Sequence, residues 1–241
     1  PPLPMPLDNL SATYADGCLY VAGGKGKPQT VPIGQDGSQT APTNPLFSLQ
    51  LTPSLQKEWV RLPDFPGPAR VQPVLTAQQS EDGIRLYLAG GFQPASAHQE
   101  AIVCTDMLSY HPKTKQWRNE GFLPSLAGGS HRTVTGGCAI ASGDSSILLV
   151  GGVNYDRFRN ALNHPEPDYL LHPADWYKFN TSLLQYNTFT KHWTHLGNYE
   201  ELARAGAGIA NNANTVIIIG GELKPGIRTP EVNAFKLTCH P

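Results

Sequence analysis

Residues 18–24 read Cys-Leu-Tyr-Val-Ala-Gly-Gly, a short apolar run that ends in a pair of glycines. Three more runs end in the same way, and the four glycine pairs begin at residues 23, 90, 151 and 220. Successive pairs are therefore 61 to 69 residues apart, which is enough for four short strands with their turns and too long for a solenoid repeat. This period predicts a β-propeller.

The composition agrees with a turn-rich β protein and excludes several classes of function. The 241 residues include 24 glycines and 22 prolines, and only 15% are charged. The formal net charge is −1 and no basic block occurs, so we expect no nucleic-acid partner. Apolar runs stop at about six residues, far short of the roughly 20 that cross a bilayer, so we expect no membrane partner. The four cysteines are too dispersed for a structural zinc site, and we expect neither metal nor cofactor.

The third repeat shows the predicted strand order most clearly. Its strands are expected at residues 131–143, 147–150, 182–186 and 192–194. A tyrosine in the third strand is followed seven residues later by a tryptophan in the fourth, as in Tyr186 and Trp193. We expect these aromatic pairs to fill the space between neighbouring sheets.

The order of apolar run, glycine pair, tyrosine and tryptophan resembles the kelch repeat, in which four strands form one propeller blade. The resemblance covers the whole chain and implies one all-β domain, a kelch-type β-propeller over residues 1–241. About four blades are visible, approximately at residues 8–62, 69–120, 130–197 and 203–241. The last blade lacks a tryptophan strand, so we expect the visible blades to be part of a larger array.

The segment after the fourth apolar run carries the strongest functional signal. It reads Gly-Gly-Glu-Leu-Lys-Pro-Gly-Ile-Arg-Thr at residues 220–229. Together with Gly-Gly-Val-Asn at 151–154 and Trp-Tyr-Lys-Phe-Asn at 176–180, it resembles the N-acetylneuraminate epimerases, the sialic acid mutarotases, including their cyclically permuted members.

The resemblance implies a six-bladed propeller that interconverts the α and β anomers of N-acetylneuraminic acid. The family's Gly-Glu-x-Lys-Pro-Gly-x-Arg-Thr segment is matched in full, so Glu222 and Arg228 correspond to its catalytic glutamate and partner arginine. A looser match lies at residues 65–72, where Val71 replaces an acid. The resemblance also implies export to the bacterial periplasm.

Propeller geometry places further polar residues on the face that carries Glu222 and Arg228. In a propeller, the loops between second and third strands and the segments that lead into first strands all open on one face, around the central axis. Besides Glu222 and Arg228, these loops and segments carry the candidate substrate-binding residues Lys25, Asn154, Arg70, His131 and Arg204. A few convergent polar groups in an apolar frame are typical of a ligand pocket.

Each of these assignments has a structural alternative. Glu222 suits proton transfer at a sugar ring, and Arg228 suits a bidentate grip on a carboxylate, a task that Arg70 or Arg204 could share. Alternatively, Glu222 is a surface carboxylate paired with Lys224 or Arg228. For Arg70 and Arg204, the alternative to ligand binding is that they brace adjacent blades.

Residues 153–181 form the longest insertion and are rich in aromatic residues. Short helices are predicted near 169–171 or 174–178, and we expect the insertion to cover the pocket, since long loops in compact domains are usually functional. The alternative is that its aromatic residues only anchor a flap.

Two other function classes compete with an isomerase. A non-catalytic kelch module would use the same face to bind a carbohydrate or a protein, and the fold alone does not distinguish it from an enzyme. A copper radical oxidase would need tyrosine and histidine ligands clustered at the axis. The histidines of this sequence offer no such set.

Overall fold

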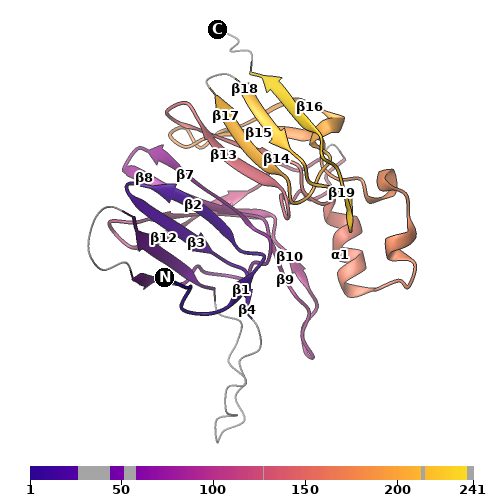
Figure 1. The fold of residues 1–241 in the computed structure, drawn as a ribbon, viewed down its shortest axis with the longest axis horizontal. Coiled ribbons are helices and arrows are strands. Elements are labelled where there is room, and N and C mark those ends of the chain that lie inside the picture. Colours follow the sequence, from indigo (N-terminus) through magenta and orange to yellow (C-terminus); the bar gives the residue numbers. More distant parts are fainter. Residues whose placement is uncertain (27–43, 52–57, 127, 213–214, 238–241) are drawn as a thin grey trace, which may run out of the picture.

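The computed structural model describes residues 1–26, 44–51, 58–126, 128–212 and 215–237. Four antiparallel sheets follow one another along the chain and fan out around a common centre (Figure 1). Each sheet is one blade, so the fold is the predicted β-propeller.

The blades are built from consecutive strands. Blade 1 contains β2 (Ser11–Ala15), β3 (Cys18–Ala22), β5 (Leu46–Gln50) and β6 (Trp59–Leu62); blade 2 contains β7 (Val74–Ser80), β8 (Gly83–Ala89), β11 (Asp106–His111) and β12 (Gln116–Phe122); blade 3 contains β13 (Cys138–Ser142), β14 (Ser146–Val150), β15 (Ser182–Asn187) and β16 (Trp193–Asn198); blade 4 contains β17 (Gly208–Asn212), β18 (Thr215–Ile219) and β21 (Val232–Lys236). Within each blade, every strand pairs with the next one in this order.

One predicted strand is wrong at its start. We expect a first strand over residues 131–143, but β13 begins only at Cys138. The preceding residues include Gly136, whose N–H donates to the Gln72 carbonyl of the neighbouring blade (3.0 Å). Within their own blade, the Thr135 carbonyl accepts from the Val153 N–H (3.0 Å), but the regular ladder with β14 begins only at Cys138.

The first strands β2, β7, β13 and β17 are neighbours in series and line the centre. The segments that lead into them are joined by backbone hydrogen bonds from blade to blade. Gln72 N–H donates to the Asn9 carbonyl (2.8 Å), Gly136 N–H to Gln72 (3.0 Å) and Gly206 N–H to Gly136 (2.7 Å). We call this series the central backbone chain.

The glycine pairs allow the second strands to end against the next blade. Gly151 and Gly152 both have positive φ, at 66° and 87°. A Cβ at Gly152 would lie 2.7 Å from the Thr135 carbonyl oxygen, and one at Gly151 would lie 2.7 Å from that of Arg204. Only residues without a Cβ fit both the conformation and the space.

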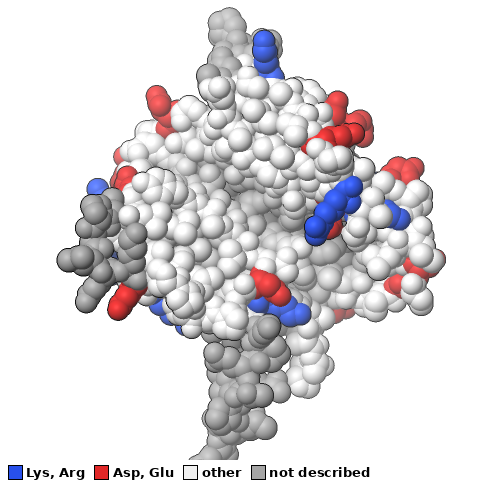
Figure 2. All heavy atoms as spheres, in the orientation of Figure 1, with Lys and Arg blue, Asp and Glu red and all other residues white. Residues whose placement is uncertain are grey.

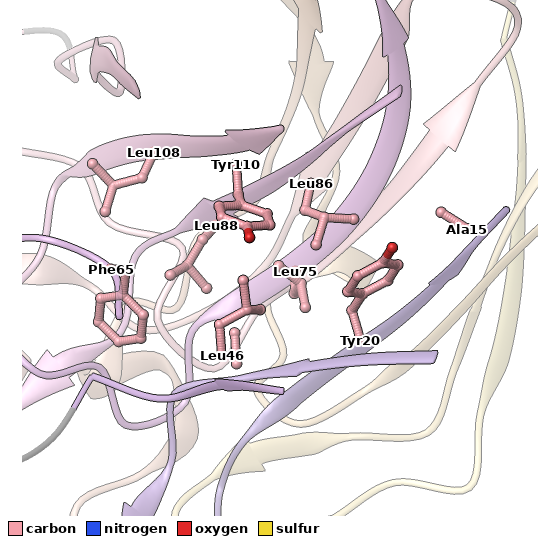
Figure 3. Packing of buried hydrophobic residues seen from close by; sticks show 10 residues of the cluster. Ala15, Tyr20, Leu46, Phe65, Leu75, Leu86, Leu88, Leu108 and Tyr110 are labelled. Atoms are coloured by element: carbon pink, nitrogen blue, oxygen red, sulfur yellow. The ribbon is translucent and has the colours of Figure 1, made fainter. Parts of the chain in front are cut away.

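The hydrophobic core lies between blades. The cluster between blades 1 and 2 contains Tyr20 and Leu46 from one sheet and Leu86, Leu88 and Tyr110 from the other (Figure 3). Equivalent clusters join blades 2 and 3 and blades 3 and 4. Each blade is therefore stabilised by its neighbour.

The tyrosine–tryptophan pairs behave as predicted. Tyr110 and Trp117 are directly paired across β11 and β12, with ring centroids 5.0 Å apart, and Tyr186 and Trp193 lie 4.8 Å apart. The indole N–H of Trp117 also donates to the Pro63 carbonyl (2.9 Å), beyond the end of blade 1. The pair thus stabilises the contact between blades.

Three two-stranded sheets and an insertion complete the described structure. In the first, β1 (Leu7–Asp8) pairs with β4 (Lys25–Gly26); the other two are the hairpins of β9 (Phe92–Gln93) with β10 (Ile102–Val103) and of β19 (Glu222–Lys224) with β20 (Ile227–Arg228). The helices are α1 (Tyr155–Asn163) and the 3₁₀ turns η1 (Tyr169–Leu171), η2 (Ala174–Tyr177) and η3 (Glu200–Leu202). Among the described residues, no helix has both the length and the apolarity to span a bilayer.

The two places at which the sequence predicts a short helix in the insertion both carry a 3₁₀ turn, η1 and η2, but α1 is not predicted by our sequence reading. Its N-cap is Asn154, whose side-chain oxygen accepts a hydrogen bond from Arg157 N–H (3.0 Å). Asp156 in the first turn also favours a helix there. One apolar residue of α1, Phe158, packs edge-on against Phe92 of β9, with centroids 5.1 Å apart.

Candidate functional site

Glu222 and Arg228 face each other across the β19–β20 hairpin. They are direct cross-strand partners, and Arg228 Nε lies 3.5 Å from Glu222 Oε1. The Arg228 side chain is 83% exposed and that of Glu222 is 31% exposed. Pro225 and Gly226 form the turn, and Gly226 has a φ of 78°. The spacing of the two residues across the turn therefore produces a carboxylate and a guanidinium side by side, both open to a ligand.

Backbone pairing fixes the position of Glu222. Glu222 N–H donates to the Ala205 carbonyl (2.7 Å), and Ala205 N–H donates back to Glu222 (3.0 Å). Ala205 belongs to the segment that leads into β17, next to Gly206 of the central backbone chain. The carboxylate is thus carried at the inner end of blade 4.

The same position recurs in every blade, directly after the glycine pair. Lys25 pairs with Asp8, Phe92 with Val71, and Val153 N–H donates to the Thr135 carbonyl (3.0 Å). The four equivalent positions, which we call the inner positions, are occupied by Lys25, Phe92, Val153 and Glu222. Of the predicted binding residues, exposed Lys25 is the one that shares this position with Glu222.

Arg70 and Arg204 lie in the blade interior, and each makes the same set of contacts. Arg70 is 1% exposed; its Nη1 donates to the Gly90 carbonyl (2.9 Å) and its Nη2 to both Asp106 carboxylate oxygens (2.8 Å). Arg204 is 3% exposed and bonds in the same way to the Gly220 carbonyl (3.1 Å) and to Glu231 (2.7 Å).

These contacts favour bracing over ligand binding, but the arginines brace strands within one blade and not adjacent blades as we expect from the sequence. Each guanidinium joins the glycine that ends a second strand to the acid where the third strand begins. Such charge-assisted hydrogen bonds are strong and geometrically specific. Each arginine therefore holds together the second and third strands of its own blade, blade 2 for Arg70 and blade 4 for Arg204. Neither guanidinium is presented to solvent.

Asn180 performs the equivalent task in blade 3, where Val134 stands in the place of the arginine. Its Nδ2 donates to the carbonyl oxygens of Thr133 (2.8 Å), Gly151 (3.2 Å) and Val153 (3.0 Å). Asn180 is 9% exposed. Our sequence reading does not single out this residue, although it ends the Trp-Tyr-Lys-Phe-Asn segment.

Asn154 and His131 are both near the start of α1. The Asn154 side chain caps the helix, as described above, and is half-buried. His131 is exposed and packs against Tyr155, with ring centroids 5.1 Å apart. Its neighbour Arg132 is 7% exposed, and burial lowers its pKa; no described residue bonds its Nε or Nη1. Of this group, His131 is the one that is open to a ligand.

The insertion lies between the hairpins of blades 2 and 4. At one end, Asn163 of α1 exchanges hydrogen bonds with the backbone of Ala101, beside β10 (2.7 and 3.2 Å). At the other end, η2 contacts β19, and Lys224 Nζ donates to the His172 carbonyl (2.6 Å). Figure 1 shows α1 and β19 on the same side of the molecule. The insertion is therefore next to the hairpin that carries Glu222.

An aromatic cluster gives the insertion its own core. Tyr177 and Phe179 are buried with Val153, and Ala205, the backbone partner of Glu222, packs against them. The Tyr177 hydroxyl donates to the Tyr169 carbonyl, and burial raises the pKa of both tyrosines. The aromatic residues thus tie the insertion to the lead-in segment of blade 4.

Within the described part of the chain, one group of side chains has the spacing of metal ligands. Glu166, Asp168 and His172 bring ligand atoms within 4.8 Å of one another, and both carboxylates are exposed. Exposed acids at this spacing are common without a metal. Charged side chains on the face in Figure 2 form small separate groups and no continuous basic surface.

The sequence match decides the family. The family model of N-acetylneuraminate epimerase matches residues 24–240. This chain belongs to the N-acetylneuraminate epimerase family. The matched range includes the Glu222 hairpin and the insertion.

The family's curated members are similar over most of this chain. An N-acetylneuraminate epimerase of Haemophilus influenzae (strain PittEE) is 30% identical over 94% of the chain, which covers 60% of that protein. One of Pasteurella multocida (strain Pm70) is 27% identical over 83% of the chain and 52% of that protein. The chain thus spans somewhat more than half the length of these relatives.

The fold has a solved counterpart. The structure of YjhT superposes on the entire chain with a TM-score of 0.72 at 23% sequence identity, and the chain covers 68% of it. This similarity supports the propeller fold. The name of the family, N-acetylneuraminate epimerase, denotes an isomerase.

Proposed function

We propose that this protein is a mutarotase that interconverts the α and β anomers of N-acetylneuraminic acid. The observation that carries the proposal is the Glu222–Arg228 pair, a carboxylate and an exposed guanidinium 3.5 Å apart at the inner end of blade 4. A sugar acid presents a hydroxyl to be deprotonated and a carboxylate to be bound, both at its anomeric carbon. The pair matches these two groups.

Arg228 would bind the sugar carboxylate. An arginine can donate two parallel hydrogen bonds to a carboxylate, which fixes its orientation as well as its position. The exposed Arg228 side chain has its donors available apart from the long contact with Glu222. Exposed Lys25, at the equivalent inner position of blade 1, and His131 beside Tyr155 are further candidates for polar contacts to the sugar.

Glu222 would act as the general base. Its carboxylate takes the proton of the anomeric hydroxyl, and the electron pair of that O–H bond forms the carbonyl as the bond between the anomeric carbon and the ring oxygen breaks. The ring oxygen takes up a proton, which gives the open keto form. Rotation of the carbonyl and attack of the ring hydroxyl on its other face, with the proton transfers reversed, complete the exchange of anomers.

This reaction has no net redox change and loses no group, so acid–base chemistry and binding suffice for it. Holding the carboxylate beside the base contributes by orienting the anomeric hydroxyl. The aromatic insertion next to β19 would form one wall of the site and exclude water. Location in the periplasm is part of the same proposal, because it rests on the family resemblance.

Proton NMR tests the proposal directly. Freshly dissolved N-acetylneuraminic acid is followed through its α and β signals, with the parent protein and with Glu222→Gln, at a pH where spontaneous exchange is slow. We expect faster equilibration with the parent, reduced at least about 100-fold in the variant, as for loss of a general base. Binding of the sugar without acceleration by the folded parent would refute the enzyme and leave the non-catalytic kelch module.

A further inference from the structure

Lys224 belongs to the same motif as Glu222 and Arg228, but its ammonium group has a different environment. Nζ donates to the backbone carbonyls of His172 (2.6 Å) and Leu170 (3.2 Å), which both belong to the insertion. An ammonium has three donors, so two of the three are engaged by carbonyls about 50 residues away in sequence. Arg228 differs: it lies 3.5 Å from Glu222, makes no backbone contact with the described insertion, and its side chain is 83% exposed.

The segment that receives these hydrogen bonds is held in one arrangement by aromatic contacts. The His172 ring stacks on Trp176 at 3.9 Å with an interplanar angle of 6°, and the Arg157 guanidinium lies 4.5 Å from the centroid of the same indole. Tyr169 and Tyr177 pack around Trp176. The carbonyls bonded by Lys224 are therefore part of a packed unit and not of a loose loop.

The hairpin is fixed to the same unit from its other side. Ala205 exchanges two backbone hydrogen bonds with Glu222 and also packs against the aromatic cluster of the insertion. Glu222 thus lies between two attachments: its own backbone is bound to Ala205, and Lys224, two residues on, is bound to the insertion. Loss of either attachment would free the hairpin on one side.

We infer that Lys224 is a positioning residue, which fastens residues 168–177 of the insertion to the hairpin of Glu222, and is not a ligand of the sugar acid. Lys224 is the basic residue nearest to Glu222 in the motif. Without these contacts it would be the obvious partner of the sugar carboxylate. The attachment of the insertion to the hairpin is inferred from the contacts alone. Its effect on catalysis rests on the proposed function.

Hydrogen exchange with mass spectrometry tests the attachment without any activity. Lys224→Met keeps the length of the side chain and removes its donors, while Lys224→Arg keeps charge and donors. In Lys224→Met we expect the amides of residues 168–177, among them the Leu171 N–H that donates to Asp168, to exchange about tenfold faster, as for loss of a charge-assisted hydrogen bond. Lys224→Arg should restore most of the protection.

Lys178→Met is the matched control, because Lys178 is an exposed lysine of the same insertion. It should leave exchange at 168–177 unchanged. If Lys224→Met also leaves it unchanged, the attachment is refuted, whatever its effect on activity.

Anomer exchange kinetics separate positioning from substrate binding. We expect Lys224→Met to lower kcat about tenfold with KM within about twofold, because the base is misplaced while the carboxylate grip of Arg228 remains. A raised KM with unchanged kcat would overturn the inference and assign Lys224 to the substrate. If the parent protein shows no anomer exchange at all, the proposed function fails, and the hydrogen-exchange result still decides the attachment.

Discussion

Replacing Asp106 by Asn should destabilise the protein and leave its ligand site intact. The Arg70 side chain is fully buried and that of Asp106 is 22% exposed, and the two share hydrogen bonds of 2.8 Å. Removing one partner of a buried pair costs about 3–5 kcal/mol, because the other charge stays buried without compensation. The partial exposure of Asp106 and the remaining Gly90 contact of Arg70 place the expected loss near the lower end, at about 3 kcal/mol.

Urea unfolding followed by tryptophan fluorescence measures this loss. With a slope of about 3 kcal/mol per molar urea, the midpoint should fall by about 1 M. Asp64→Asn is the control, since Asp64 pairs with Arg61 at the surface, where the two side chains are 41% and 49% exposed. It should cost at most about 1 kcal/mol. Equal midpoints for the two variants, or an Asp106→Asn protein of normal stability with a raised KM, would refute the bracing role of Arg70.

Two further predictions concern stability. Hydrogen bonds from Arg85 lower the pKa of Asp82 from 3.8 to about 2, so its contribution is present above about pH 4 and is lost as the pH falls towards 2. Because the Asp82 side chain is 38% exposed, Asp82→Asn should lower the free energy of unfolding in urea by only about 1 kcal/mol at pH 6. If the variant is still less stable than the parent at pH 2 by the same amount, the Arg85–Asp82 interaction is not the source of the difference. Gly152→Ala should lower the free energy of unfolding by at least about 2 kcal/mol, because the new Cβ would lie 2.7 Å from the Thr135 carbonyl oxygen. Gly143→Ala, also at positive φ but in open space, should lower it by only about 1 kcal/mol. Equal losses for the two variants in thermal or urea unfolding would refute the steric argument.

The blade architecture could be predicted from the sequence because its signals are local. A glycine pair after an apolar run marks a strand that ends against a neighbouring blade. A tyrosine and a tryptophan seven residues apart mark a hairpin, since Tyr110 and Trp117 are direct cross-strand partners. Both signals repeat, so the first repeat that is read correctly predicts the others.

The helix α1 was missed because its signal is ambiguous. Residues 155–163 are mostly polar, and the helix buries none of its residues fully. Asparagine is a common N-cap residue, but in the sequence Asn154 fits a substrate-binding role equally well. A helix held by its cap, by aromatic contacts of Tyr155 and Phe158, and by the Asn163 bonds to Ala101 depends on tertiary structure that sequence reading does not provide.

The candidate site likewise has one part that the local sequence predicts and one part that depends on tertiary structure. The Glu222–Arg228 pair follows from the motif, because a separation of six residues across a Pro-Gly turn makes the two residues cross-strand partners. Arg70 and Arg204 could not be placed from the sequence, because their role depends on Asp106 and Glu231, which are 27 or more residues away. Charge alone does not tell whether an arginine faces a ligand or a buried acid.

The central backbone chain has a consequence for how chemistry can change in this fold. The hydrogen bonds of the central backbone chain are made by N–H and carbonyl groups of Asn9, Gln72, Gly136 and Gly206, so they do not depend on the side chains at the inner positions. One such position carries a carboxylate, another an ammonium group and two carry hydrocarbon. Evolution can therefore exchange the reactive groups of the propeller one blade at a time while its architecture stays the same.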